Sequence, residues 1–248
     1  MVITSHDNAK IAEIVKLSQK KYRRLAQRYV IEGARLVHDA ISHGAKVRGI
    51  YVAESAASDF NFDGQVVVAD RVFAKISDTV NSQGVLAVVE MVEDLLEPPT
   101  GNCLVLDGLQ DPGNVGTLIR TAAACGFADI YAVNSVDLYS PKVLRSAMSA
   151  HFCVRLHEID SIEQAFALLS SCEITCADMG GSNVFETEFA GKTALVLGND
   201  GNGLSDYSRS HAARTVALPM ANGFESLNVA VAGSVIMYQI FSQSNIRR

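Results

Sequence analysis

The chain has 248 residues, of which 48% are hydrophobic and 19% charged, as in a soluble globular protein of one large or two modest domains. No apolar run is long enough to span a membrane, and the start, Met1-Val2-Ile3-Thr4-Ser5, lacks a signal-peptide pattern, so we expect a cytoplasmic protein. The net charge of −6 hides an asymmetry, because residues 1–50 contain ten Lys or Arg and four Asp or Glu, and the rest contains 11 and 23.

Residues 1–96 predict a small α/β domain. Apolar spacing favours a helix over residues 8–17, with Ile11, Ile14 and Val15 on one face. A strand at 29–32 and a helix over 34–41 that ends at Gly44 follow it. The remaining apolar runs predict strands at 49–52, 66–69 and 85–89.

Six basic residues fall within thirteen positions of this domain: Lys16, Lys20, Lys21, Arg23, Arg24 and Arg28. Such a run is either the solvated face of a helix or a surface that binds phosphate. The one-sided charge of residues 1–50 favours an anionic partner that docks here.

Residues 93–102 break the apolar periodicity, and the adjacent Pro98 and Pro99 favour an extended connector. A second domain, residues 101–248, alternates strands and helices. Strands are predicted at 104–106, 130–133, 154–156, 174–177, 194–197 and 216–218, and helices at 115–125, 161–170 and 228–241. The strands are continuously apolar, which is typical of a parallel sheet covered on both faces.

Three polar, glycine-bearing segments each join a strand of this domain to a helix: Asp107–Gly116, Leu197–Ser205 and Leu218–Asn228. Taken alone, Ser226 and Asn228 are the kind of residue that caps a helix. Ligands of parallel sheets bind beyond the strand C-termini, so three such loops together predict a binding site.

The loop Gly198–Gly203 has the glycines that bring main chain close to a ligand. It is not a phosphate-binding Walker A loop, and its glycine spacing differs from the dinucleotide fingerprint of NAD-linked Rossmann enzymes, which disfavours that class. A ligand read by main chain, such as an adenine or amino-acid moiety, suits it.

No metal site is expected, because neither the cysteines nor the six histidines show ligand spacing. All five cysteines lie in or beside apolar stretches and are interpreted as buried small hydrophobic residues: Cys103, Cys125, Cys153, Cys172 and Cys176.

In order and spacing, the three segments resemble the motifs of the SpoU (TrmH-type) branch of the SPOUT RNA 2′-O-ribose methyltransferases. Residues 107–126, with Asn114 and Arg120, resemble motif 1; residues 195–205 resemble motif 2; residues 218–231 resemble motif 3. Residues 139–146 also match family sequence between them. Residues 31–37 and 82–85 are similar to the L30-like substrate domain of many members, mostly those that act on ribosomal RNA.

This resemblance implies an α/β fold with a deep trefoil knot in the C-terminal domain and a homodimer whose active sites combine both subunits. It implies an S-adenosylmethionine site formed by Leu197, Gly198, Asn199, Gly203, Leu218, Met220 and Leu227. It also implies an RNA substrate, for which the candidate contacts are Lys20, Lys21, Arg23, Arg24, Arg35 and Arg145.

The implied catalytic residues are Asn114, Arg120, Asp200, Ser226 and Asn228, with Glu225 as a further candidate. Because an arginine rarely loses its proton, we interpret Arg120 as a clamp on the target phosphate and a stabiliser of the developing alkoxide, not as a base. Motif 2 commonly has Glu where this chain has Asp200, so an orienting role of Asp200 toward Arg120 would need a bridging water.

Two hypotheses remain open at this point. The first is an active RNA 2′-O-methyltransferase, with ribosomal RNA favoured over transfer RNA. The second is an RNA-binding ribosome-assembly factor with an inactive site, which the joint presence of Asn114, Arg120, Ser226 and Asn228 disfavours.

Overall fold

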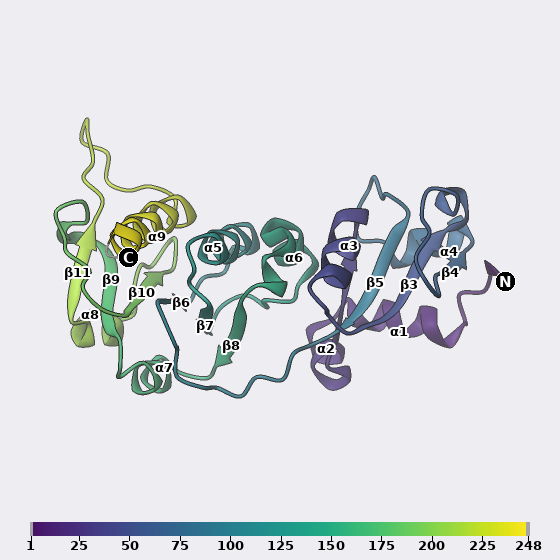
Figure 1. Cartoon of the computed structure of the whole chain (residues 1–248), viewed down its shortest axis with the longest axis horizontal. Helices are drawn as coiled ribbons and strands as arrows, with labels where there is room; N and C mark the ends of the chain where they lie inside the picture. Colours follow the sequence, from purple (N-terminus) through teal and green to yellow (C-terminus); the bar gives the residue numbers. More distant parts are fainter. Residues whose placement is uncertain (1, 247–248) are drawn as a thin grey trace. The chain divides into compact units, whose positions relative to one another are not determined.

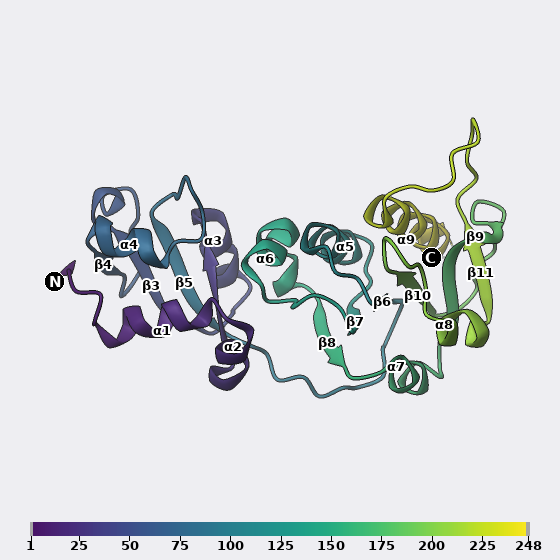
Figure 2. The same ribbon diagram turned by 180° about the vertical axis from the view of Figure 1, so that it is seen from behind.

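The computed structural model describes residues 2–246, which divide into two compact units (Figures 1 and 2). Unit 1 contains the residues up to 93 together with residues 139–152. Unit 2 contains residues 94–138 and the chain from residue 153 onward. The prolines of the expected connector therefore fall in unit 2, close to the point where the chain leaves unit 1.

Unit 1 is built on a mixed five-stranded sheet in the order β1-β4-β3-β5-β2. Its strands are β1 (Val2–Ile3), β2 (Arg28–Glu32), β3 (Val47–Ala53), β4 (Val66–Val68) and β5 (Val85–Glu90). Its helices are α1 (Ala9–Leu17), α2 (Lys20–Ala26), α3 (Ala34–Ser42), α4 (Asp70–Ile76) and α6 (Pro141–Ala147), with 3₁₀ turns at Glu54–Ala56 and Met148–Phe152.

Apolar clusters cover both faces of this sheet. On one face, Ile11 and Ile14 of α1 pack with Phe73 of α4. On the other, Val37 of α3 and Leu144 of α6 lie against the strands. Burial of one such side chain contributes about 1.5–3 kcal/mol, so each helix is held mainly by its apolar stripe.

Unit 2 contains a six-stranded, wholly parallel sheet in the order β11-β9-β10-β6-β7-β8. Its strands are β6 (Cys103–Asp107), β7 (Asp129–Val133), β8 (Arg155–Ile159), β9 (Glu173–Asn183), β10 (Thr193–Gly198) and β11 (Arg214–Ala217). Its helices are α5 (Pro112–Ala124), α7 (Ile162–Leu168), α8 (Asp206–His211) and α9 (Val229–Ile246).

Helices α7 and α8 lie on one face of this sheet, and α5 and α9 lie together on the other (Figure 1). Gly233 lets α9 pack this closely, because a Cβ there would lie 2.4 Å from Leu197 Cδ1 and 2.7 Å from Leu118 Cδ2. A hydrogen bond of 2.9 Å between the hydroxyls of Thr121 and Ser234 joins the same two helices. The expected parallel sheet, covered on both faces, is confirmed.

The structure contains elements that the sequence analysis did not predict. These are the two-residue strand β1 and the short helices α2, α4, α6 and α8. Segments of six or seven residues rarely show a clear apolar period, although the seven-residue α7 was predicted. The segment 139–152 lies in the middle of the expected second domain, yet it packs within unit 1.

Candidate active site

Three loops of unit 2 emerge at one edge of its sheet. Strands β6 and β10 are neighbours in exact register, with Leu106 opposite Leu197 and Asp107 opposite Gly198. Strand β9 pairs with β10 on the side away from β6, and β11 pairs with β9; all four strands run parallel. The loops that follow β6, β10 and β11 therefore share the carboxyl edge, where the sequence placed the site.

A chain of side-chain hydrogen bonds links the three loops. Asn228 Nδ2 donates to Asn114 Oδ1 at 3.0 Å, and Asn114 Nδ2 donates to Asp200 Oδ2 at 2.8 Å. Each residue comes from a different motif. The structure thus brings together three of the five predicted catalytic residues through direct contacts.

Asn114 and Asn228 both lie at the N-terminus of a helix, which fixes their positions. Asp111 caps α5 by accepting from Asn114 N at 2.8 Å, and Pro112 occupies the first turn. Asn228 Oδ1 accepts from Ala230 N at 3.0 Å and from Val231 N at 3.3 Å, so it caps α9. Asn228 therefore caps a helix and also contacts Asn114, two roles that the sequence presented as alternatives.

Asp200 makes no direct bond to Arg120. Its carboxylate accepts from Asn114, and Arg120 forms no hydrogen bond or ion pair with any residue between 2 and 246. Arg120 is exposed near the end of α5, and Ser226 and Glu225 lie in the exposed segment before α9. The direct partner of Asp200 is therefore Asn114, and the water-bridged role toward Arg120 stays a prediction.

The second loop is a tight, self-bonded turn. Asn199 and Gly203 exchange two main-chain hydrogen bonds of 2.8 and 2.9 Å, and Asn199 Nδ2 donates to Gly108 O at 2.7 Å. A Cβ at Gly198 would lie 2.3 Å from the main-chain atoms Gly203 C and Leu204 N. Gly198 is thus required by close approach of the loop to itself, whereas the sequence interpretation assigned that approach to a ligand.

Asp107 is a site residue that the sequence reasoning missed. This buried carboxylate, at the end of β6, accepts from Ser205 N at 2.9 Å and from Ser208 Oγ at 2.7 Å, which ties the first loop to the second. An acidic residue that ends an otherwise apolar strand was the available signal.

The third loop leaves main-chain groups available for a ligand. The main-chain N–H groups of Leu218, Met220 and Leu227 donate no hydrogen bond to any other residue that the structure describes. Met220 and Leu227 also expose 37% and 46% of their surface. Unpaired main-chain donors beside apolar side chains fit the adenosine and methionine parts of S-adenosylmethionine.

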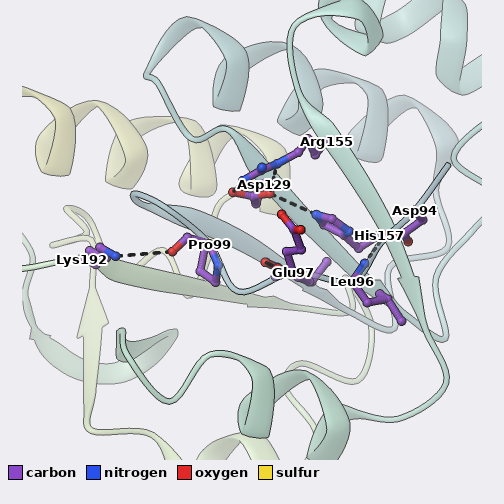
Figure 3. Close-up of polar contacts among 9 residues, drawn as sticks. Asp94, Leu96, Glu97, Pro99, Asp129, Arg155, His157 and Lys192 are labelled. Carbon is purple, nitrogen blue, oxygen red and sulfur yellow. Dashed lines mark hydrogen bonds and ion pairs between the residues drawn. The ribbon is translucent and has the colours of Figure 1, made fainter. Parts of the chain in front are cut away.

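A second polar cluster lies at the opposite edge of the sheet, where β7 and β8 begin (Figure 3). The ring of His157 contacts two carboxylates, with Nδ1 2.6 Å from Asp94 Oδ1 and Nε2 3.0 Å from Asp129 Oδ1. Arg155 donates two further bonds to Asp129, of 2.6 and 2.8 Å. The stacked ring of Tyr131 lies 4.6 Å from that of His157.

This second cluster is structural. Burial lowers the pKa of His157, but its hydrogen bonds to the carboxylates of Asp129 and Asp94 outweigh burial and raise the pKa. Burial likewise raises the pKa of Asp129, and its bonds to His157 and Arg155 outweigh that effect and lower it. The cluster attaches Asp94, at the start of the connector, to the edge of the sheet that lacks the three loops.

The predicted RNA contacts in unit 1 need one correction. Arg23 is only 4% exposed, and its Nη1 donates to the carbonyl oxygens of Leu17 and Ser18, each at 2.7 Å. It joins α1 to α2 and is not a surface cation, so its assignment to RNA was wrong. Lys21 and Arg24 on the same helix are exposed.

The other predicted contacts are accessible to different degrees. The Arg35 side chain is 78% exposed, and its Nε lies 3.6 Å from Asp39 Oδ2. Arg145 Nη1 donates to Asp78 Oδ2 at 2.5 Å and is 37% exposed. Lys20 is partly buried.

Among the cysteines, Cys153 is exposed and Cys172 partly exposed, so the expectation that all five are buried was wrong for these two. Within residues 2–246, no group of three or more Cys, His, Asp or Glu side chains is arranged to hold a metal ion. Among the helices between residues 2 and 246, none combines the length and hydropathy of a transmembrane span.

Comparison with known proteins identifies the family of the chain. Residues 101–238 match the SpoU rRNA Methylase family, and residues 8–87 match an MRM3-like substrate binding domain. The chain is 32% identical to an uncharacterized tRNA/rRNA methyltransferase of Synechocystis, with 96% of this chain and 92% of that protein covered. It is 29% identical to the 23S rRNA (guanosine(2553)-2'-O)-methyltransferase RlmP of Bacillus subtilis, over 96% of this chain and 98% of that protein.

Among solved structures, the SpoU methyltransferase AviRb from Streptomyces viridochromogenes, in complex with the cofactor AdoMet, is similar with a TM-score of 0.86. The sequences are 26% identical, and 96% of this chain and 98% of that chain are covered.

Proposed function

Because the chain belongs to the SpoU rRNA methylase family, we propose that the three linked loops of unit 2 carry out methyl transfer from S-adenosylmethionine to a ribose 2′-hydroxyl of RNA. The chain is an S-adenosylmethionine-dependent RNA 2′-O-methyltransferase that acts on ribosomal RNA. The observation that carries the assignment of the site is the Asn228–Asn114–Asp200 chain, because it joins the three motifs in one place.

The protein's part in the reaction is to place the ribose and stabilise charge. The bound cofactor supplies an electrophilic methyl group on a sulfonium. Asn114 and Asn228 hold the first and third loops in a fixed relation, which keeps the 2′-hydroxyl aligned with the methyl group. Arg120, exposed and free of partners within the described chain, clamps the neighbouring phosphate and stabilises the alkoxide as it forms.

The proposed cofactor-binding residues lie in the second and third of these loops. Leu218, Met220 and Leu227 offer main-chain donors, and Leu197, Gly198, Asn199 and Gly203 shape the neighbouring turn. The deep trefoil knot that the motifs imply belongs to this proposal, and its support is the TM-score of 0.86 to AviRb.

A homodimer is also part of the proposal. Helix α9 exposes Val231, Val235 and Tyr238, with exposed fractions of 49%, 36% and 53%, at a spacing that places them on one face. A second copy of the chain would cover this apolar stripe. Sedimentation should report a dimer that Tyr238→Asp dissociates, whereas the control Leu25→Asp, at a 72% exposed residue of unit 1, should remain dimeric.

Ribosomal RNA is favoured over transfer RNA because the relatives that match both units include a 23S rRNA methyltransferase. A cytoplasmic location is consistent with that substrate. The decisive experiment maps 2′-O-methyl positions in total RNA with and without the gene. Loss of one ribosomal RNA methylation supports the proposal, and an unchanged map with impaired ribosome assembly would support the inactive assembly factor.

A further inference from the structure

Unit 1 contains a pocket of about 200 Å³ that plays no part in the methyl-transfer site. It lies among α1, α4, α6 and the end of β2. Its volume is several times the roughly 30 Å³ that one water molecule occupies in the liquid. The pocket is therefore large enough for a small planar group.

The walls of the pocket are aliphatic. Ile14, Ile31, Ile76 and Leu144 line it, and each is at most 8% exposed. Val15, which is 46% exposed, stands at its edge. Such walls favour contact with the face of an uncharged ring.

The rim of the pocket carries charged side chains of both signs. Lys75 is exposed and forms no hydrogen bond or ion pair with any other residue in the described part of the chain. Asp78 uses one carboxylate oxygen, Oδ2, to accept from Arg145 at 2.5 Å, and its side chain is 54% exposed. The rim thus offers one free cation and one carboxylate oxygen as an acceptor.

Glu32 also lines the pocket, but its carboxylate is occupied. It accepts from the hydroxyls of Ser77, Thr79 and Ser82 at 2.5–2.7 Å and from Asp78 N at 2.9 Å. Burial raises the pKa of Glu32, and these four bonds outweigh burial and lower it. Glu32 therefore holds the segment that carries Asp78 in place, and the groups available to contact a ligand are those of the rim.

We propose that this pocket receives one unpaired nucleobase of the RNA substrate. The aliphatic walls contact the face of the base, Asp78 accepts from its N–H edge, and Lys75 pairs with the adjoining phosphate. An N–H edge suited to a carboxylate is offered by guanine, adenine and cytosine. This inference rests on the proposed function, because it takes RNA to be the ligand of unit 1.

Pocket-filling variants test the proposal. Val15→Trp places an indole at the pocket edge, and Ile41→Trp is its control, since Ile41 is also 46% exposed but lies on α3 outside the pocket. Asp78→Asn and Lys75→Gln change only rim groups, and Lys10→Gln is the control for the loss of one surface lysine of unit 1. The probe is deproteinised 23S rRNA from a strain without the gene.

Two quantities are measured on the full chain: the affinity for this RNA at fixed salt, and the protection of single bases from kethoxal and dimethyl sulfate. We expect Val15→Trp to lower affinity about ten-fold or more relative to Ile41→Trp and to abolish protection of one base. Lys75→Gln should weaken binding more than Lys10→Gln, and Asp78→Asn should weaken the same protection.

Equal affinity and equal protection in Val15→Trp and Ile41→Trp would overturn the proposal. If Val15→Trp does not fold, as judged by thermal melting, the comparison of Lys75→Gln with Lys10→Gln decides. If Val15→Trp binds naked RNA normally but methylates intact ribosomal subunits poorly, the pocket takes a protein side chain and the proposal is wrong. Failure of the proposed function looks different, because wild type would then methylate no RNA while base protection stays measurable.

Discussion

The substitution Asn114→Ala tests whether the three loops act as one site. It removes the bond from Asn228 Nδ2 and the bond to Asp200 Oδ2, of 3.0 and 2.8 Å. Each partly exposed side-chain hydrogen bond contributes about 1 kcal/mol, so about 2 kcal/mol of loop organisation is lost. At 1.36 kcal/mol per factor of ten, this predicts a fall in kcat/KM of about 30-fold.

The assay is methyl transfer from labelled S-adenosylmethionine to RNA, with kcat/KM measured for Asn114→Ala, Asn228→Ala and the double variant. Because the two residues share one bond, we expect the double variant to lose less than the product of the single losses. Asn202→Ala is the control, since it removes an asparagine from the second loop that makes no side-chain bond to the described residues. Full multiplicativity of the two losses, or an equal loss in the control, would refute the linked-loop account.

Three further predictions follow from the packing and charges. Gly198→Val should lower the thermal stability of unit 2 as well as cofactor binding, because its Cβ would lie 2.3 Å from Gly203 C; a variant that melts like wild type and binds S-adenosylmethionine normally would contradict this. Neutralising Lys21 and Arg24 should weaken RNA binding and flatten its salt dependence while the fold stays intact. In contrast, Arg23→Ala should lower the melting temperature, because Arg23 is buried between α1 and α2. Because the pKa of His157 is raised on folding, its contribution to stability is full at pH below the unfolded-state pKa of 6.5 and is lost as pH rises through the folded-state pKa. The melting temperature of wild type should therefore approach that of His157→Gln as pH rises above about 6.5. A difference between the two melting temperatures that stays constant with pH would exclude this titration.

Much of the fold of unit 2 could be predicted from the sequence. Continuous apolar runs such as Leu104–Leu106 are typical of a parallel sheet covered on both faces, which is what the structure contains. The loops after such strands must share an edge, so the grouping of Asn114, Asp200 and Asn228 followed from topology and the family motifs together.

Other features depend on contacts that no local pattern specifies. Arg23 is identical in type to its exposed neighbour Arg24, and only the position of the Leu17 and Ser18 carbonyl groups decides that it is buried. Asp200 contacts Asn114 because of where α5 begins relative to the end of β10. The two residues are 86 positions apart in the sequence, so no local pattern specifies this contact. The placement of residues 139–152 in unit 1 is likewise a property of packing, because residues 139–146 match family sequence that lies between the motifs of the second domain.

The most direct test of the central claim is methyl transfer to deproteinised 23S rRNA from a strain that lacks the gene, with wild type beside Arg120→Ala and Arg120→Lys. Wild type should methylate one ribose 2′-hydroxyl. Arg120→Ala should be about a hundred- to a thousand-fold slower, as expected for the loss of one transition-state donor, while it still binds RNA. Arg120→Lys should recover little, because an ammonium lacks the planar fork of the guanidinium. Tight RNA binding by wild type with no transfer, or Arg120→Ala as fast as wild type, would contradict the account.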